Sequence, residues 1–285
     1  MADSYFLPEL LREILLKFPA KSLLRFTTVF ESWHSVITSF PFISAHLAQT
    51  PHSDTFIVRR YVSTSNREHY SLFQDSKNQP FYLNFTSELN FPFNCQLGYF
   101  RIIGSCNGIL CLADDLFGFV NGAVHWIAYD VVANGGGLRS LVMTFSIADE
   151  VFGEILLPDA LVGVIPMNLS IMLFEESLVV VRYEREIDDA SCEVWVMKQY
   201  GVFESWSRLY SINLVADMEK IVGFRNNGEV LFTTRSNDLI SYDPNSGRNM
   251  GLCIQGSYRS FYVQNYMESL ILLKGNNAVL SNVVD

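Results

Sequence analysis

Asn-Gly pairs between apolar runs are the feature that most constrains what this chain can fold into. They occur at Asn107-Gly108, Asn121-Gly122 and Asn227-Gly228. Both central residues of a tight hairpin turn adopt positive φ, which Asn and Gly tolerate. The surrounding runs have strand composition and no helical periodicity. We therefore predict antiparallel strands within 56–61, 99–112, 117–129, 138–147, 178–183, 194–197, 221–233, 260–264 and 270–273.

A second type of hairpin recurs in this region, with an aspartate at its corner: Asp75, Asp149 or Asp243. Pairing the second Asn-Gly turn with Asp149, and the third with Asp243, gives four strands each, the content of one propeller blade. Residues 171–210 supply a similar unit, whose first turn is Glu175-Glu176. These turns recur about every fifty residues, the spacing of kelch-like propellers.

The first fifty residues follow a helical period instead. Apolar side chains recur with helical spacing at Leu7, Leu10, Leu11, Ile14, Leu15 and Phe18. Pro19 ends this run, and helical spacing continues from Leu23 to about Phe40, where Pro41 is expected to stop it. Two or three short helices should result. A segment of this size buries only part of its apolar stripe, and periodicity alone leaves open whether the remainder packs on the downstream domain or binds a partner.

Composition excludes several classes of protein. With 49% hydrophobic residues, the 285-residue chain can bury a substantial core. Its formal charge of −10 has the wrong sign for neutralising phosphates, so no nucleic-acid partner is expected. No apolar run is long enough to span a bilayer and no secretory signal is recognisable, so we expect no membrane partner and a cytoplasmic or nuclear location. The five cysteines include no C-x-x-C pair, which indicates reduced thiols.

No group of residues in the sequence assembles a catalytic or metal site. The five histidines are scattered, so no metal is expected, and His125 is interpreted as a packing residue. The glycine-rich segment 134–137 has no following helix to bind a phosphate, and the carboxylates within 184–189 are typical of a solvated loop. Trp126, Trp195 and Trp206 are core candidates. The expectation is a protein that is not an enzyme and needs no cofactor.

Five elements of the N-terminal segment form one pattern: Leu7-Pro8, Glu13-Ile14-Leu15, the run 18–26, Val29 and Ser32-Trp33. This pattern resembles the plant F-box, a three-helix module. The resemblance implies docking on a Skp-type adaptor, which joins F-box proteins to a cullin in an SCF-type ubiquitin ligase. Together with the apolar stripe, it favours a partner-binding face and implies adaptor contacts at Leu7, Pro8, Leu11, Ile14, Leu15, Pro19, Leu24 and Trp33.

The segment departs from the F-box pattern in three places. Leu7-Pro8 lies one residue closer to Glu13 than in the family. Either the first turn is re-registered, which rotates that end of the helix by about 100°, or Phe6-Leu7 substitutes for the usual Leu-Pro pair. Phe30 replaces the usual small residue, and Glu31 replaces the usual lysine, both close to Trp33. We expect these changes to weaken docking.

Downstream motifs carry a second resemblance: 105–111 (Ser-Cys-Asn-Gly-Ile-Leu-Cys), 120–126 (Val-Asn-Gly-Ala-Val-His-Trp), 194–197 (Val-Trp-Val-Met), 204–210 with Glu-Ser-Trp and Leu-Tyr, and Tyr242-Asp243-Pro244. They resemble the plant F-box-associated domain. In that family a longer stretch separates the first two motifs, so at least one blade's worth of sequence is expected to be missing. The chain would rejoin near Leu116-Phe117.

Together these features predict an α+β chain, with a three-helix F-box at 1–48, a linker at 49–55 and an all-β, propeller-like domain at 56–285 that is short of one or more blades. The expected function is substrate recognition within an SCF-type ubiquitin ligase, with an unidentified protein substrate. The acidity of the propeller favours a target with a basic face. Three alternatives remain: an interaction module without ligase docking, a propeller glycosidase with converging carboxylates, and a non-functional truncated product.

Overall fold

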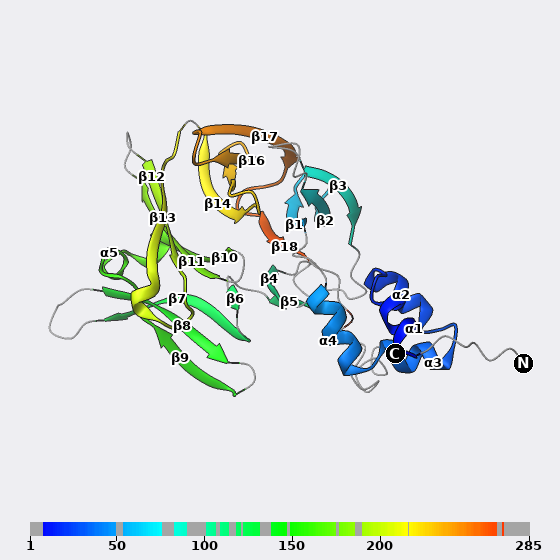
Figure 1. The fold of residues 1–285 in the computed structure, drawn as a ribbon. Helices are drawn as coiled ribbons and strands as arrows, with labels where there is room; N and C mark the ends of the chain where they lie inside the picture. Colours follow the sequence, from blue (N-terminus) through cyan, green and yellow to red (C-terminus); the bar gives the residue numbers. More distant parts are fainter. Residues whose placement is uncertain are drawn as a thin grey trace, which may run out of the picture. The chain divides into compact units, whose positions relative to one another are not determined.

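The computed structural model describes residues 8–49, 54–75, 83–89, 101–106, 109–113, 118–120, 122–131, 138–146, 149–174, 177–185, 190–215, 217–266 and 270 (Figure 1). For residues 8, 101–106, 109–113, 118–120, 131 and 138 it describes the backbone alone. The chain divides into two compact units, Met1–Ser53 with Asn107–Ile109 and Tyr266–Asp285, and Asp54–Cys106 with Leu110–Asn265.

Four helices form the described N-terminal part of the first unit: α1 (Pro8–Leu15), α2 (Ala20–Phe26), α3 (Glu31–Ile37) and α4 (Phe40–Gln49). The prediction of two or three helices missed α4. Its expected terminator, Pro41, is the second residue of α4, a position where the missing N–H of proline costs no helical hydrogen bond. Pro19 does separate α1 from α2, and its carbonyl oxygen accepts hydrogen bonds from the first turn of α2.

The helices bury one apolar cluster. Leu15, Leu23, Ile37 and Phe42 are at its centre, and each is 1% exposed or less. Leu270, from the far end of the chain, belongs to the same cluster. Burying each such side chain contributes about 1.5–3 kcal/mol, which is what holds four short helices together.

The second unit consists of antiparallel sheets (Figure 1). Their strand orders are β18-β1-β2-β3, β4-β5, β6-β7-β8-β9, β10-β11-β12-β13 and β14-β15-β16-β17. The strands are β1 (Thr55–Val62), β2 (Arg67–Asp75), β3 (Leu83–Glu88), β4 (Arg101–Cys106), β5 (Ile109–Ala113), β6 (Gly118–Val120), β7 (Ala123–Val131), β8 (Leu138–Ser146), β9 (Val151–Ile155), β10 (Leu169–Phe174), β11 (Ser177–Arg185), β12 (Ala190–Met197), β13 (Trp206–Asn213), β14 (Met218–Phe224), β15 (Val230–Thr234), β16 (Asp238–Asp243), β17 (Arg248–Gln255) and β18 (Tyr262–Asn265). Helix α5 (Asp159–Val162) and the single turns η2 (Pro166–Asn168) and η3 (Phe203–Ser205) connect them.

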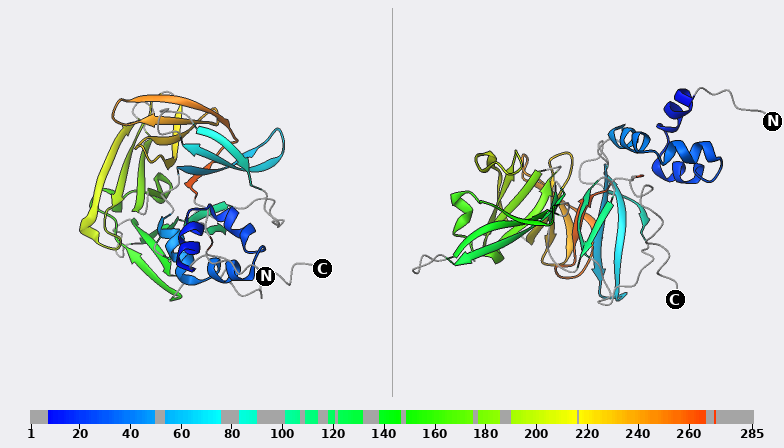
Figure 2. Two further views of the ribbon diagram at one scale, coloured as in Figure 1. Left: turned by 45° about the vertical axis from the view of Figure 1, so that its right-hand side comes forward. Right: turned by 90° about the horizontal axis from the view of Figure 1, so that it is seen from below.

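The sheets of the second unit form a closed ring, as Figure 2 shows. Their innermost strands contact one another in the order β4, β6, β10, β14, β18 and back to β4. The ring closes because β18, the last strand, pairs with β1, the first, from Phe56 opposite Asn265 to Arg59 opposite Tyr262. The first and last described strands thus form one sheet, so the two ends of the propeller are joined by strand pairing.

The predicted blades are confirmed in three places. Strands β6 and β7 pair up to Val120 and Ala123, and the corner at Asp149 joins β8 to β9, within one sheet. The Asn227 and Asp243 hairpins likewise share the β14–β17 sheet, and 171–210 lies in the β10–β13 sheet. Gly122 and Gly228 have φ of +72° and +86°, as these turns require.

The described strands of the β4-β5 sheet are consistent with the predicted shortening. Among the described residues, this sheet has two strands whereas the other four have four each. It occupies its own place in the ring, between the β1 sheet and the β6 sheet. The suspected junction at Leu116-Phe117 lies outside the described residues. The described structure therefore contains four complete blades and a two-stranded sheet that completes the circle.

Neighbouring blades pack through buried apolar clusters. One joins the β10–β13 sheet to the β14–β17 sheet, with Val181 and Phe232 at its centre. A second joins the β6–β9 sheet to the β10–β13 sheet, and a third joins the β14–β17 sheet to the β18-β1-β2-β3 sheet around Phe56. Alternate residues of each strand face these clusters, because successive side chains point to opposite faces.

A buried ionic network links the first sheet to the last complete blade. Arg225 is fully buried and donates to both carboxylate oxygens of Asp75, with Nε 3.3 Å from Oδ2. It also donates to Glu229 and to the Ser241 hydroxyl, and Ser241 donates to Glu229 over 2.6 Å. The guanidinium charge is therefore balanced by two carboxylates within the ring junction.

Candidate functional sites

The helical unit exposes apolar side chains that its own core does not cover. On α1, Leu10 and Ile14 lie one turn apart, and Phe18 follows beyond the end of that helix. We define the helical apolar surface as Leu10, Ile14, Phe18, Leu24, Val29 and Phe30, all of which are exposed. This many exposed apolar side chains on a small unit are typical of a protein-binding face.

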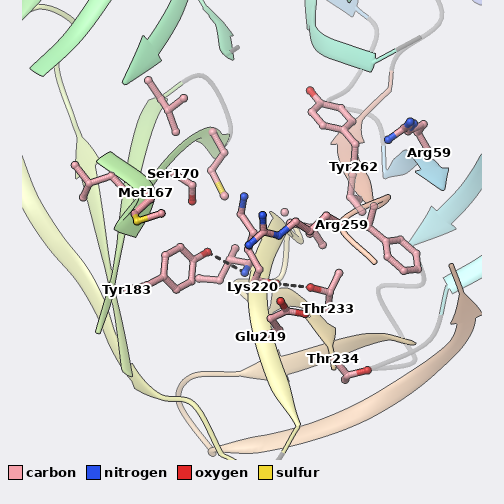
Figure 3. Close-up of a pocket in the computed structure, with 18 of the residues that line it drawn as sticks. Arg59, Met167, Ser170, Tyr183, Glu219, Lys220, Thr233, Thr234, Arg259 and Tyr262 are labelled. Carbon is pink, nitrogen blue, oxygen red and sulfur yellow. Dashed lines mark hydrogen bonds between the residues drawn. The ribbon is translucent and has the colours of Figure 1, made fainter. Parts of the chain in front are cut away.

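A cavity of about 710 Å³ is the second candidate site, and it lies in the second unit (Figure 3). Strands β10, β14 and β18 line it, together with η2 and the loop that precedes β18. The buried Tyr183 hydroxyl accepts a hydrogen bond from the Ile221 backbone at 3.0 Å, which ties β14 to β11 beside the cavity. Burial raises the pKa of this phenol, so it stays protonated.

Comparison with known protein families places both units. Residues 7–44 match the F-box domain, and residues 117–271, more than half of the chain, match the F-box associated beta propeller domain. The chain belongs to the F-box associated beta propeller family. The helical unit is thus its F-box, and the ring of sheets is its propeller.

Two plant F-box proteins are similar to this F-box propeller protein. The F-box protein At3g07870 of Arabidopsis thaliana is 30% identical over 135 residues, 40% of this chain and 31% of the relative. The F-box protein CPR1 of the same plant is 24% identical over 170 residues, 56% of this chain and 39% of the relative. The chain therefore matches less than two fifths of either relative's length.

The F-box positions three of the predicted adaptor contacts at its surface. Ile14 and Leu24 are 39% and 43% exposed, and Pro19 is exposed between them in sequence. Leu15, in contrast, is 1% exposed in the helical core, so its side chain is not accessible in this structure. Leu11 and Trp33 are half-buried at the margin of that core.

The remaining two predicted contacts are at the N-terminus. Pro8 is the first residue of α1, and Leu7 lies outside the described residues. The prediction did not select Leu10, Phe18, Val29 and Phe30, which are part of the helical apolar surface. Leu10 and Phe18 could have been selected from the sequence, because both belong to its apolar stripe with helical spacing.

Two departures from the F-box pattern have local structural roles. Phe30 is 57% exposed, and its ring lies 5.5 Å from that of Trp33, which also contacts Phe26. The larger residue therefore widens the helical apolar surface without entering the core. Glu31 is the first residue of α3, where a negative charge interacts favourably with the helix dipole.

The other candidate residues of the propeller have structural partners. His125 is fully buried, and its Nε2 lies 2.7 Å from the Tyr200 hydroxyl. Trp206 donates its indole N–H to the Leu156 carbonyl, and Trp195 donates to Glu193. In the part of the chain that the structure describes, no three metal-ligating side chains come together, and no helix there is long and apolar enough to cross a membrane.

The Cys192 thiol is expected to be unreactive in the folded propeller. Burial, with a smaller contribution from the Glu193 carboxylate, raises its pKa to about 12. Because the thiolate is the reactive form, alkylation at pH 8 should be about 1,000-fold slower than for an ordinary thiol. Peptide mass spectrometry after iodoacetamide treatment should find Cys253, which is exposed, modified first. In denaturant both should react, and equal rates in the native protein would contradict the burial of Cys192.

Proposed function

We propose that this chain is a non-catalytic substrate-recognition subunit of an SCF-type ubiquitin ligase. In this role the F-box, assigned to residues 1–48, binds a Skp-type adaptor and through it a cullin. The propeller, assigned to 56–285, holds a protein substrate. The helical apolar surface is the observation that carries the proposal, because an F-box of this size leaves Leu10, Ile14, Leu24 and Phe30 exposed to solvent.

Proximity supplies the mechanism of such a subunit. A protein that holds the adaptor at one end and a substrate at the other makes ubiquitin transfer effectively intramolecular. No nucleophile or general base is needed on the recognition subunit itself. Since the adaptor, cullin and substrate must share a compartment, we propose a cytoplasmic or nuclear site of action.

A propeller glycosidase would need two carboxylates facing one cavity. Among the described residues that line the 710 Å³ cavity, Glu219 is the single carboxylate. That composition favours binding over hydrolysis. A propeller that binds partners without joining a ligase is the second candidate function, and the exposed Phe30 beside Trp33 is the departure that motivates it.

Adaptor binding tests the proposal directly. Isothermal calorimetry with the full chain and a purified plant Skp-type adaptor should give a sub-micromolar Kd. Replacing Ile14 and Leu24 together by Asp should raise that Kd by more than about 100-fold, because truncating or charging central apolar contacts costs at least about 2 kcal/mol each. Leu15 is unsuitable for this test, since a charge at its buried position would unfold the helices.

The matched control replaces two exposed valines of the propeller, Val151 and Val215, by Asp. This variant makes the same change in charge, also at two exposed aliphatic positions, and it should bind the adaptor like the wild-type chain. Equal affinity for the Ile14→Asp/Leu24→Asp variant and wild type, or no binding by a cooperatively melting wild-type chain, would reject the ligase role and favour the stand-alone propeller.

A further inference from the structure

The propeller cavity has the size and position of a binding site for a peptide segment. At about 710 Å³ it falls within the usual range of ligand sites, about 300–1,000 Å³. Its walls come from the inner strands of three blades, β10, β14 and β18, so residues distant in the sequence converge on it. Inner strands of this kind are held on both sides by neighbouring blades, which gives the site rigid walls.

The charge of the cavity is opposite to that of the whole chain. The chain has a formal charge of −10, yet the charged residues that line the cavity are four cations and one anion: Arg59, Arg185, Lys220, Arg259 and Glu219. Arg59 is paired with Glu68 at 2.7 Å, and both side chains are largely buried. Without that pair, the lining still has an excess of two positive charges.

Two of the cations lie over aromatic rings. The Arg185 guanidinium carbon lies 5.6 Å from the centre of the Tyr183 ring, and that of Arg259 lies 4.9 Å from the Tyr258 ring. A cation–π contact of this kind leaves the guanidinium N–H groups able to bind a carboxylate in bidentate fashion. Arg259 has a φ of +56°, an unusual backbone conformation for arginine, and Figure 3 labels it and Lys220 among the residues that line the cavity.

Apolar groups adjoin these cations. Met167, in η2, lines the cavity and is 80% exposed. Ile171 and Met172 of β10 also line it, and their side chains pack against the apolar clusters on the two faces of the sheet. Methionine side chains are flexible and adapt to different apolar groups. The cavity therefore offers a positively charged part and an apolar part within the reach of one short segment.

From this arrangement we propose that the cavity binds an acidic segment of the substrate protein, in which an apolar side chain adjoins carboxylates. Arg185, Lys220 and Arg259 contact the carboxylates, and Met167 contacts the apolar side chain. The inference rests on the proposed substrate-recognition role and names the substrate class for it. It also reverses the expectation from net charge, which favoured a basic target, because local charge at the site outweighs distant charge screened by salt.

Fluorescence anisotropy with the full chain tests this proposal. The probe is a fluorescein-labelled twelve-residue peptide of Asp and Glu around one central Leu. Two matched peptides have Asn and Gln, or Lys, in place of the acids. We expect the acidic peptide to bind at least tenfold more tightly than either, and its affinity to fall as salt rises. Because the chain is strongly acidic overall, non-specific attraction cannot produce this order.

Charge reversal in the cavity provides the second arm. The Arg185→Glu/Arg259→Glu variant should lose at least tenfold in affinity for the acidic peptide. The Lys198→Glu/Arg248→Glu variant, which makes the same charge change at exposed positions outside the cavity lining, should lose less than twofold. Equal losses in both variants, preference for the Lys peptide, or no binding of the acidic peptide at 500 µM would overturn the proposal.

The two proposals fail separately. A chain that binds the adaptor but not the acidic peptide keeps its ligase role and loses only the assignment of the cavity. If the chain binds the acidic peptide but no adaptor, it keeps the cavity as a binding site and loses the ligase role.

Discussion

Replacing Arg225 by Met should lower the free energy of unfolding of the propeller by about 3–5 kcal/mol. The substitution preserves much of the side-chain volume but removes the charge that balances Asp75 and Glu229, both of which have largely buried side chains. Two carboxylates would then remain in the ring junction without their cation, and Ser241 would keep only one of its two network partners. Chemical denaturation followed by far-ultraviolet circular dichroism measures the loss.

The matched control is Arg139→Met, which removes an arginine from a 3.7 Å pair with Asp130 where both side chains are exposed. That change should cost less than about 1 kcal/mol. Adding Asp75→Asn and Glu229→Gln to the Arg225→Met variant should restore part of the stability, since no unbalanced carboxylate remains. A cost for Arg225→Met as small as that of the control would show that the network does not hold the ring together.

Introducing a carboxylate into β18, the strand that closes the ring, should lower the free energy of unfolding of the propeller by a similar amount. Val263 in β18 is largely buried and lies opposite Val58 of β1. It also packs tightly against Gly223 of β14, because a Cβ added at Gly223 would lie only 3.2 Å from the Cβ of Val263. Val263→Glu places an acid within this tight contact, so we expect a loss of about 4 kcal/mol or more. Because a domain has only about 5–15 kcal/mol of stability, the melting transition should broaden or disappear.

Gln264→Glu is the control for this variant. It adds the same side chain one residue further along β18, where the side chain points to the opposite face and Gln264 already accepts a hydrogen bond from Tyr262. We expect a change below about 1 kcal/mol in differential scanning calorimetry. If Val263→Glu melts as sharply and at the same temperature as Gln264→Glu, closure by β18 is not what holds the ring.

Much of the propeller could be predicted from local patterns, because each blade repeats the same turn chemistry. The predicted hairpins pair consecutive strands in two blades: those of Asn121 and Asp149 belong to the β6–β9 sheet, and those of Asn227 and Asp243 to the β14–β17 sheet. The pairing of β18 with β1 has no local signal of this kind, since it joins segments at opposite ends of the domain. Helix α4 was missed for another reason, because proline was interpreted as a terminator at a position where a helix can begin.

The candidate sites were less predictable than the fold. Helix α1 is apolar on two sides, with Leu11 and Leu15 toward the core and Leu10 and Ile14 toward solvent. Periodicity identifies such a helix but does not show which side packs inward, and so it placed Leu15 among the surface contacts. The basic cavity has no sequence pattern, because its cations come from separate strands and loops and meet only when the ring closes.

Ring closure also means that the first blade cannot be completed until the end of the propeller has been synthesised. Arg59 in β1 donates a hydrogen bond to the Ser260 carbonyl, 201 residues later in the chain, and β1 gains its inner neighbour only when β18 has been made. At about 5–20 residues per second, the ribosome takes roughly 10–40 s to synthesise the intervening segment. During that interval the first blade has an open edge, so its apolar strands depend on chaperones or on rapid completion of the chain to avoid aggregation. A premature stop anywhere before Tyr262 thus leaves every earlier blade in an unclosed ring.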